Sequence, residues 1–325
     1  MRIDPFVLAI ALSIVIAFFF PQLGSADSIV PIETISSIGI SLIFFFYGLK
    51  LSTEAIRSGL KNWKLHVVVQ FTTFVLFPLL VLAFYPLAKD TSYEILWLSM
   101  LFLAALPSTV SSSVVMVSLA KGNVPAAIFN ASISGIIGIM LTPLWLTPFI
   151  QQTDIPIDFS DIYVQLATEI ILPLVLGLLL RKYWGEFARK NSRGLSLFDK
   201  SIILLIIYKS FVHSFEEKIF ESVSILELVL MTGLVIALFF LVYGLTGWIG
   251  KRLHFNREDR ITAKFCGSKK SLVHGTVFSK ALFGQSSIIG LILLPLMIFH
   301  AFQILIISVL ATRMARQIDR KKKEL

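Results

Sequence analysis

The sequence has little charge and almost no cysteine. Soluble domains carry about 25% charged residues, but Asp, Glu, Lys and Arg make up only 15% of these 325 residues, and hydrophobic residues make up 56%. The one cysteine, Cys266, excludes an internal disulfide. Apolar runs near the length that crosses a hydrocarbon core recur along the chain. This composition excludes an ordinary soluble domain and predicts an all-α polytopic membrane protein.

Motifs for catalysis, nucleotide binding and metal binding are also missing. The sequence contains no phosphate-binding loop, metal-ligand spacing or nucleotide fingerprint, which argues against primary active transport by this chain alone. The net charge of +9 would indicate nucleic acid in a soluble protein, but here the position of the basic residues matters more. We expect the basic tail, 316–325, to orient the chain and to contact lipid headgroups. We expect the protein to have no nucleic-acid partner and no cofactor.

Ten hydrophobic spans are expected. They cover residues 5–20, 32–49, 65–88, 93–119, 123–149, 160–180, 199–215, 224–249, 260–286 and 288–312. The first run ends in Phe-Phe-Phe-Pro and not in the small residues of a signal-peptide cleavage site, so we expect it to remain as a span. Lys and Arg gather in alternate connections and in the tail. This asymmetry places both termini in the cytoplasm of a multi-pass inner or plasma membrane protein.

The spans divide into two halves of five, residues 1–150 and 151–315. Because five is an odd number, the halves cross the membrane with opposite orientation, which is the arrangement of an inverted repeat in secondary transporters. The fourth span of each half is interrupted, at 107–113 and at 267–271. Paired interruptions at matching positions indicate a transporter binding site, whereas either one alone would be read as a packing kink.

The two interruptions differ in chemistry. Pro107 has no N–H to donate and clashes with the preceding turn, so the first is expected to break its helix. The second carries Lys269 and Lys270, and ionisable residues at membrane depth are functional candidates by default. The predicted substrate site consists of Pro107, Ser108, Thr109, Ser111, Ser112 and Ser113, and of Gly267, Ser268, Lys269, Lys270 and Ser271.

Three segments resemble a known family. They are 106–116 (Leu-Pro-Ser-Thr-Val-Ser-Ser-Ser-Val-Val-Met), 119–123 (Leu-Ala-Lys-Gly-Asn) and 265–272 (Phe-Cys-Gly-Ser-Lys-Lys-Ser-Leu). They are similar to the bile acid:sodium symporter (solute carrier family 10) superfamily, in its branch related to vertebrate solute carrier family 10 member 7. The resemblance covers essentially the whole chain. It implies a panel domain of spans 1, 2, 6 and 7 and a core domain of spans 3–5 and 8–10. In that core, broken spans 4 and 9 cross beside two sodium sites.

The resemblance also implies sodium ligands, and here the sequence departs from the family. Bile-acid members have a glutamate two residues before the glycine of the ninth span, where this chain has Phe265. Their glutamine two residues after that glycine is matched by Lys269. The remaining positions that resemble sodium ligands are Gln70, Ser112, Ser113, Asn130, Ser132 and Ser134. Because sodium favours oxygen ligands with a carboxylate among them, two ordinary sodium sites are not expected.

The lysines suggest an alternative to sodium. We hypothesise that Lys270, or else Lys269, replaces a coupling cation, which would make transport proton-coupled or uncoupled, since burial favours the neutral amine. Alternatively, one lysine binds an anionic group of the substrate. Residues adjacent on a helix point about 100° apart, so we expect only one of them, Lys270, to face the crossover. Glu169 is either a partner for a core lysine or His274, or a vestibule residue.

Other classes of function stay open at this point. One is an intramembrane enzyme that uses a serine with Lys270, or Ser271 with His274, although no hydrolase motif supports it. The other is a non-transporting membrane regulator or scaffold. A mostly apolar cavity favours an amphipathic organic anion, such as a steroid conjugate, as the transported solute. The expected partners are therefore that anion and the bilayer, with the chain a monomer or a homodimer.

Overall fold

The computed structural model describes residues 5–24, 31–50, 62–109, 111–150, 164, 167–216, 218, 221, 224–283 and 286–323. All regular structure within these ranges is helical, as predicted. Five of the described helices are long and apolar enough to cross a membrane: Ile32–Lys50, Trp63–Leu82, Val124–Ile150, Ile225–Arg252 and Ile289–Gln317. The chain is therefore a multi-pass helical membrane protein. The ten-span inverted repeat stays a prediction.

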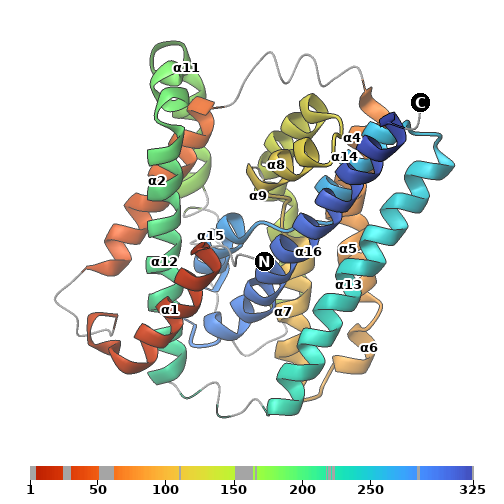
Figure 1. Ribbon diagram of the computed structural model, residues 1–325. Helices are drawn as coiled ribbons and strands as arrows, with labels where there is room; N and C mark the ends of the chain where they lie inside the picture. The colour runs from red at the N-terminus through yellow and green to blue at the C-terminus, as the bar shows by residue number, and fades with distance from the viewer. Residues whose placement is uncertain are drawn as a thin grey trace. The chain divides into compact units, whose positions relative to one another are not determined.

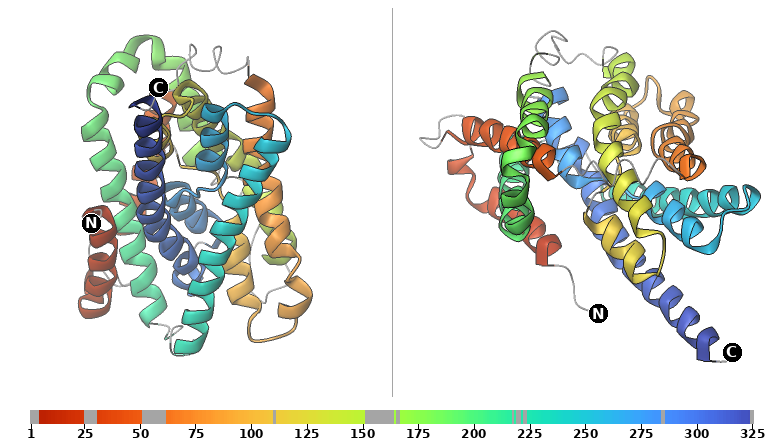
Figure 2. Two further views of the ribbon diagram at one scale, coloured as in Figure 1. Left: turned by 45° about the vertical axis from the view of Figure 1, so that its right-hand side comes forward. Right: turned by 90° about the horizontal axis from the view of Figure 1, so that it is seen from above.

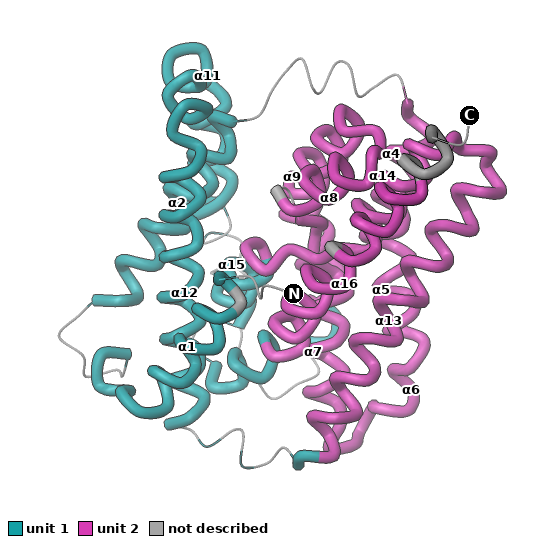
Figure 3. Tube along the Cα trace, in the orientation of Figure 1, with its two compact units in different colours: residues 1–51, 148–225, 275–293 teal, residues 52–147, 226–274, 294–325 magenta. Residues whose placement is uncertain are grey.

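The described chain forms two compact units (Figure 3). The first comprises residues 1–51, 148–225 and 275–293, and the second comprises 52–147, 226–274 and 294–325. Each unit therefore draws on both halves of the chain.

In the first unit, helix α2 (Ile32–Lys50) packs against two other helices. The unit also contains α1 (Pro5–Phe19), α11 (Leu172–Lys190) and α12 (Ser192–Glu216). α2 packs against both α11 and α12, and α1 packs against α12 (Figures 1 and 2). The α2–α11 contact is close because glycines meet there: a Cβ on Gly177 would lie 3.0 Å from the Phe45 carbonyl carbon and 3.1 Å from Gly48 Cα.

This close approach of the two helices predicts that a larger side chain at Gly177 lowers the stability of the protein. Gly177→Ala is expected to destabilise the protein by about 1–3 kcal/mol, because the added methyl must push two helix backbones apart. Unfolding can be followed through alkylation of Cys266, which is the single cysteine of the chain and is fully buried. Gly194→Ala on α12 is the matched control, since nothing lies within 4 Å of its added methyl. Equal unfolding temperatures for the two variants would contradict the prediction.

The second unit contains the interrupted spans. Its helices are α4 (Trp63–Phe71), a π-helical turn (Thr72–Leu76), α5 (Phe77–Leu82), α6 (Tyr85–Ala88), α7 (Glu94–Ala105), α8 (Ser111–Leu119), α9 (Val124–Ile150), α13 (Ile225–Arg252) and α14 (Arg257–Gly267). α15 (Leu272–Phe283) begins in this unit and α16 (Ile289–Lys323) ends in it. The expected breaks are present but shorter than predicted, because Ser111–Ser113 belong to α8 and Gly267 belongs to α14.

Several expected span ends are wrong. α16 continues to Lys323, past the expected end at residue 312, and α11 and α12 are separated by the single residue Asn191. The reason is that hydropathy marks where apolar residues stop, whereas Ala, Arg, Gln and Lys are strong helix formers and continue the helix beyond that point. The helices therefore extend further than the apolar spans.

Candidate functional site

The break between α7 and α8 leaves several buried backbone oxygens without helical donors, and each accepts a hydrogen bond from another part of the chain. Pro107 cannot continue the helix, and the Ser108 N–H donates to Ser134 Oγ at 3.0 Å. The α7 carbonyls thereby lose the donors that the next turn would supply. Thr142 Oγ1 donates to the Ala105 oxygen at 2.9 Å, and the Ser271 N–H donates to the Pro107 oxygen at 2.9 Å. The oxygens of residues 104 and 106 are left for a donor from elsewhere.

The break between α14 and α15 meets the first one directly. Besides the bond from Ser271 to Pro107, the Ser108 hydroxyl donates to the Cys266 oxygen at 2.6 Å. The backbone of Lys270 is held by one amide side chain, because its N–H donates to Gln303 Oε1 at 3.0 Å and its oxygen accepts from Gln303 Nε2 at 2.8 Å. Gln303, on α16, is fully buried. These hydrogen bonds hold the backbone of the non-helical segment 268–271 in place within the second unit.

A third irregularity lies on the helix that contains α4 and α5. At the end of the π-helical turn, the Phe77 N–H reaches back to the Thr72 oxygen. In that register the next donor would be residue 78, but Pro78 has no N–H. The Thr73 oxygen is therefore left without an intrahelical partner. π-helical turns of this kind occur frequently at functional sites.

The Lys270 side chain donates hydrogen bonds to all three of these oxygens, those of Thr73, Ala104 and Leu106. Its Nζ donates to Thr73 at 2.8 Å, Ala104 at 2.6 Å and Leu106 at 2.8 Å, and it lies 4.2 Å from the centroid of the Phe77 ring. The residue is 0% exposed. An ammonium has three N–H donors and no acceptor, whereas a neutral amine has only two donors. Three carbonyl oxygens thus match the three N–H donors of an ammonium, which is the arrangement of a carbonyl-lined cation site.

Lys269 has a different environment. Its Nζ donates to Ser112 Oγ at 2.6 Å, and Ser112 continues to Thr109 Oγ1 at 2.9 Å, which in turn contacts Ser113 Oγ at 2.8 Å. The residue is 1% exposed. This is its single hydrogen bond among the described residues, so most of its donor capacity is not taken by the protein there.

The expectation that only one lysine reaches the first interruption is wrong. Lys269 contacts Ser112 while Lys270 contacts Ala104 and Leu106. The expectation assumed helical spacing, whereas α14 ends at Gly267 and α15 begins at Leu272. Because both lysines lie outside regular helix, their side chains are free of the 100° rule.

The other predicted positions fall into three groups. Gln70 Nε2 donates to the backbone and side-chain oxygens of Asn130, both at 3.2 Å, so these two candidates meet each other. Ser132 is half-buried on α9, and the side chain of Ser111 lies outside the described residues. Glu169 lies in the first unit, half-buried on a π-helical turn (Ala167–Ile171). It forms no hydrogen bond or ion pair with any residue that the structure describes.

The remaining residues near the second break are helix caps. Ser268 returns its N–H and its hydroxyl to the Lys264 oxygen, which ends α14. The Ser271 hydroxyl accepts from the His274 N–H at 3.3 Å and lies 2.9 Å from His274 Nδ1, at the start of α15. Neither serine contacts Lys270 Nζ, whose donors are all taken by backbone oxygens. A lysine base would need a hydrogen bond to the hydroxyl that it activates, and Lys270 Nζ has none to either serine.

Phe265 replaces the carboxylate that the resemblance implied. It is fully buried and stacks on Tyr243, with ring centroids 6.1 Å apart. Among the described residues there is no group of three or more His, Cys, Asp or Glu side chains placed to hold a metal. Gln70 Oε1 is buried without a hydrogen-bond partner in the described part of the chain. Lys270 Nζ thus occupies the three main-chain oxygens, and Gln70 retains one oxygen that a cation could use.

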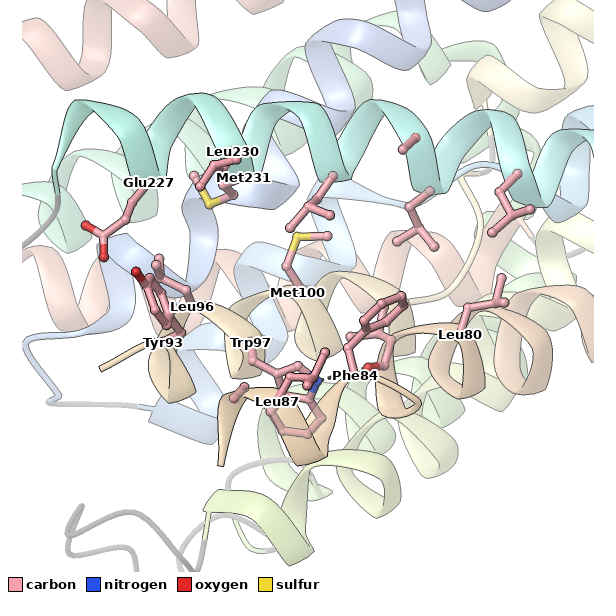
Figure 4. A pocket seen from close by; sticks show the side chains of 16 residues that line it. Leu80, Phe84, Leu87, Tyr93, Leu96, Trp97, Met100, Glu227, Leu230 and Met231 are labelled. Carbon is pink, nitrogen blue, oxygen red and sulfur yellow. Dashed lines mark hydrogen bonds between the residues drawn. The ribbon is translucent and has the colours of Figure 1, made fainter. Parts of the chain in front are cut away.

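A separate pocket of about 620 Å³ lies in the second unit, between α13 and the α5–α7 segment (Figure 4). Its walls are almost entirely apolar, with Leu80, Phe84, Met100 and Leu230 among them, and Glu227 is at one end. None of the described residues that line it is basic. An anionic solute would gain no charge complement there, so this pocket is distinct from the lysine site.

The chain resembles known proteins along almost its whole length. The sequence profile of the SBF-like CPA transporter family matches residues 4–316. The chain belongs to this family. An uncharacterized protein of Pseudomonas aeruginosa is 39% identical, with 97% of this chain and 94% of the relative covered. "Putative symporter YfeH" of Escherichia coli K12 is 36% identical, covering 98% and 94%, and "Sodium/bile acid cotransporter 7" of Rattus norvegicus is 31% identical, covering 95% and 92%.

This membership settles the class of function. As a member of the SBF-like CPA transporter family, with relatives named as symporters and cotransporters, the protein is a membrane transporter and not an enzyme. The resemblance noted from the two interruptions is confirmed. The intramembrane enzyme that used Lys270 or Ser271 is excluded, and the non-transporting scaffold is no longer needed to explain the polar interruptions.

Proposed function

We propose that this transporter moves a small organic anion by alternating access and that Lys270 occupies the position of a coupling sodium ion. The observation that carries this proposal is the Lys270 ammonium on three main-chain oxygens. Those oxygens come from two separate helix irregularities. Carbonyl oxygens are ligands for hard cations, and irregular backbone within a transporter marks its ion sites. Here the cation is part of the chain.

Lys269 is the second functional charge in this proposal. It is buried, it extends from the same interruption, and it donates one hydrogen bond among the described residues. A substrate carboxylate or sulfonate is the partner that suits its remaining donors. The rat relative is named a sodium/bile acid cotransporter, which supports an amphipathic organic anion as the solute.

The proposed architecture follows the same family. It comprises ten helices as two inverted five-helix repeats, a panel of helices 1, 2, 6 and 7 and a core of helices 3–5 and 8–10, in the cell membrane with both termini cytoplasmic. The panel rocks against the core to expose the site to each side in turn. Family membership and the paired helix breaks at 107–109 and 268–271 support this arrangement.

Uptake by purified protein in liposomes tests the proposal. We expect uptake of taurocholate, a bile acid that ends in a sulfonate, to persist when sodium is replaced by choline on both sides. The physical reason is that the ammonium already satisfies the carbonyl oxygens that sodium would use. Imposing a pH gradient in the same medium then separates proton-coupled from uncoupled transport. Uptake that falls to the level of empty liposomes without sodium would contradict the role given to Lys270.

A further inference from the structure

A second cluster of charged residues lies in the first unit, outside the lysine site. Glu33 on α2 contacts two ammonium groups: Lys209 on α12 meets Oε2, and Lys280 on α15 lies 3.2 Å from Oε1. Each carboxylate oxygen thus serves one lysine. Among the described residues, neither lysine forms an ion pair with any other acid. Two ammonium groups share one carboxylate, so the cluster carries one surplus positive charge.

The two lysines are held differently. Lys280 also donates to Ser37 Oγ at 2.5 Å and to the Glu33 backbone oxygen at 3.4 Å, and its side chain is 8% exposed. Its ammonium is therefore fixed by α2 whether or not the Glu33 carboxylate is present. Lys209 and Glu33 are more accessible, with side chains 31% and 45% exposed. Glu33 lies in the first turn of α2 and has the most exposed side chain of the three.

This geometry is that of an anion site filled by a carboxylate of the same chain. We propose that Lys209 and Lys280 form a binding subsite for the carboxylate or sulfonate group of the transported anion, which enters by displacing Glu33. The inference deepens the proposed function, on which it rests, and names a second position, which the anionic group occupies at a different step of the cycle from Lys269. Displacement exchanges one carboxylate for another anion on the same two lysines. The exchange therefore avoids exposing a bare pair of like charges, which would be unfavourable.

Glu33 acts in this scheme as an internal competitor. Without a solute it neutralises one of the two lysines, and a solute must compete with a carboxylate whose local concentration is set by the chain. Removing the carboxylate while keeping the shape, as in Glu33→Gln, should therefore favour the external anion. Removing a lysine should have the opposite effect. A simple structural tie between α2 and α15 predicts instead that both changes act in the same direction.

The test is equilibrium binding of labelled taurocholate to the purified full-length protein. We expect Glu33→Gln to lower Kd about tenfold, because the internal competitor loses its charge-assisted hydrogen bonds to the lysines. We expect Lys280→Gln to raise Kd about tenfold or more, because the solute loses such a bond. Lys280→Arg, which keeps the charge, should stay near the wild type. Unfolding temperatures from Cys266 alkylation show that the variants are folded.

Three outcomes would overturn this inference. They are weaker binding in both Glu33→Gln and Lys280→Gln, no change in Kd in either variant, and no taurocholate binding to wild type and Glu33→Gln. The proposed function fails separately, if liposomes show no uptake while binding follows the expected opposite pattern. If uptake is lost in Lys269→Gln while the Glu33 and Lys280 variants are unaffected, the subsite alone is wrong.

Discussion

Lys270→Met is expected to abolish transport and to destabilise the protein by about 3 kcal/mol or more. The substitution keeps an unbranched apolar side chain but leaves the Thr73, Ala104 and Leu106 oxygens buried without their donor. Each buried polar group that loses its partner costs about 1–3 kcal/mol. The measurements are taurocholate uptake in liposomes and unfolding followed through Cys266 alkylation. An unchanged unfolding temperature together with normal uptake would contradict the prediction.

A shorter side chain at the same position gives a sharper test. Lys270→Ala removes the ammonium and most of the stem, so that a small cation can reach the three oxygens. We expect sodium or methylammonium to raise the unfolding temperature of this variant and to leave the wild type unchanged. Choline, which is too large, is the control salt. If sodium and choline have the same effect on Lys270→Ala, the three oxygens do not form a cation site.

Lys269→Gln is expected to leave stability nearly unchanged and to weaken anion binding by about 10- to 100-fold. Lys269 has one hydrogen bond, to Ser112, among the described residues, so its loss leaves one hydroxyl to be satisfied. A charged hydrogen bond to a substrate contributes about 1.5–3 kcal/mol, which corresponds to that range of affinity. The measurement is the Kd for taurocholate, with unfolding temperature recorded on the same samples.

Two further variants separate charge from structure at this position. Lys269→Arg keeps the positive charge and is expected to retain most of the binding. Ser112→Ala removes the hydroxyl that positions the ammonium and is expected to change Kd only a few fold. If Lys269→Gln lowers stability as much as Lys270→Met and leaves Kd unchanged, Lys269 is a structural residue and the anion contact lies elsewhere.

The breaks themselves could be read from the sequence, because their causes are local. Pro107 removes a hydrogen bond and forbids the next turn whatever surrounds it. The polar run 268–271 interrupts an apolar span in a similarly direct way. Apolar composition likewise predicted a helical membrane protein, since only helices and closed barrels satisfy the backbone in lipid.

The partners of Lys270 could not be read in the same way. Main-chain oxygens carry no residue signature. The Thr73 oxygen is free only because a π-helical turn shifts the hydrogen-bond register and the next residue in that register is Pro78. Gln303 was missed too, although an amide within an apolar span is a signal that could have identified it. The error over the two lysines arose from assuming helical geometry across the segment whose helix was expected to break.

The role proposed for Lys270 has an energetic consequence for the transport cycle. A dissolved ion that enters on one side and leaves on the other performs work, about 2.3 kcal/mol per charge at 100 mV. An ammonium covalently bound to the chain returns to its starting position in every cycle, so its net displacement is zero and it supplies none of this work. Its occupancy is also independent of the salt outside the cell. The transporter is thus expected to accumulate its solute less steeply than a relative with a free ion at that position, and to work equally well in sodium-poor surroundings.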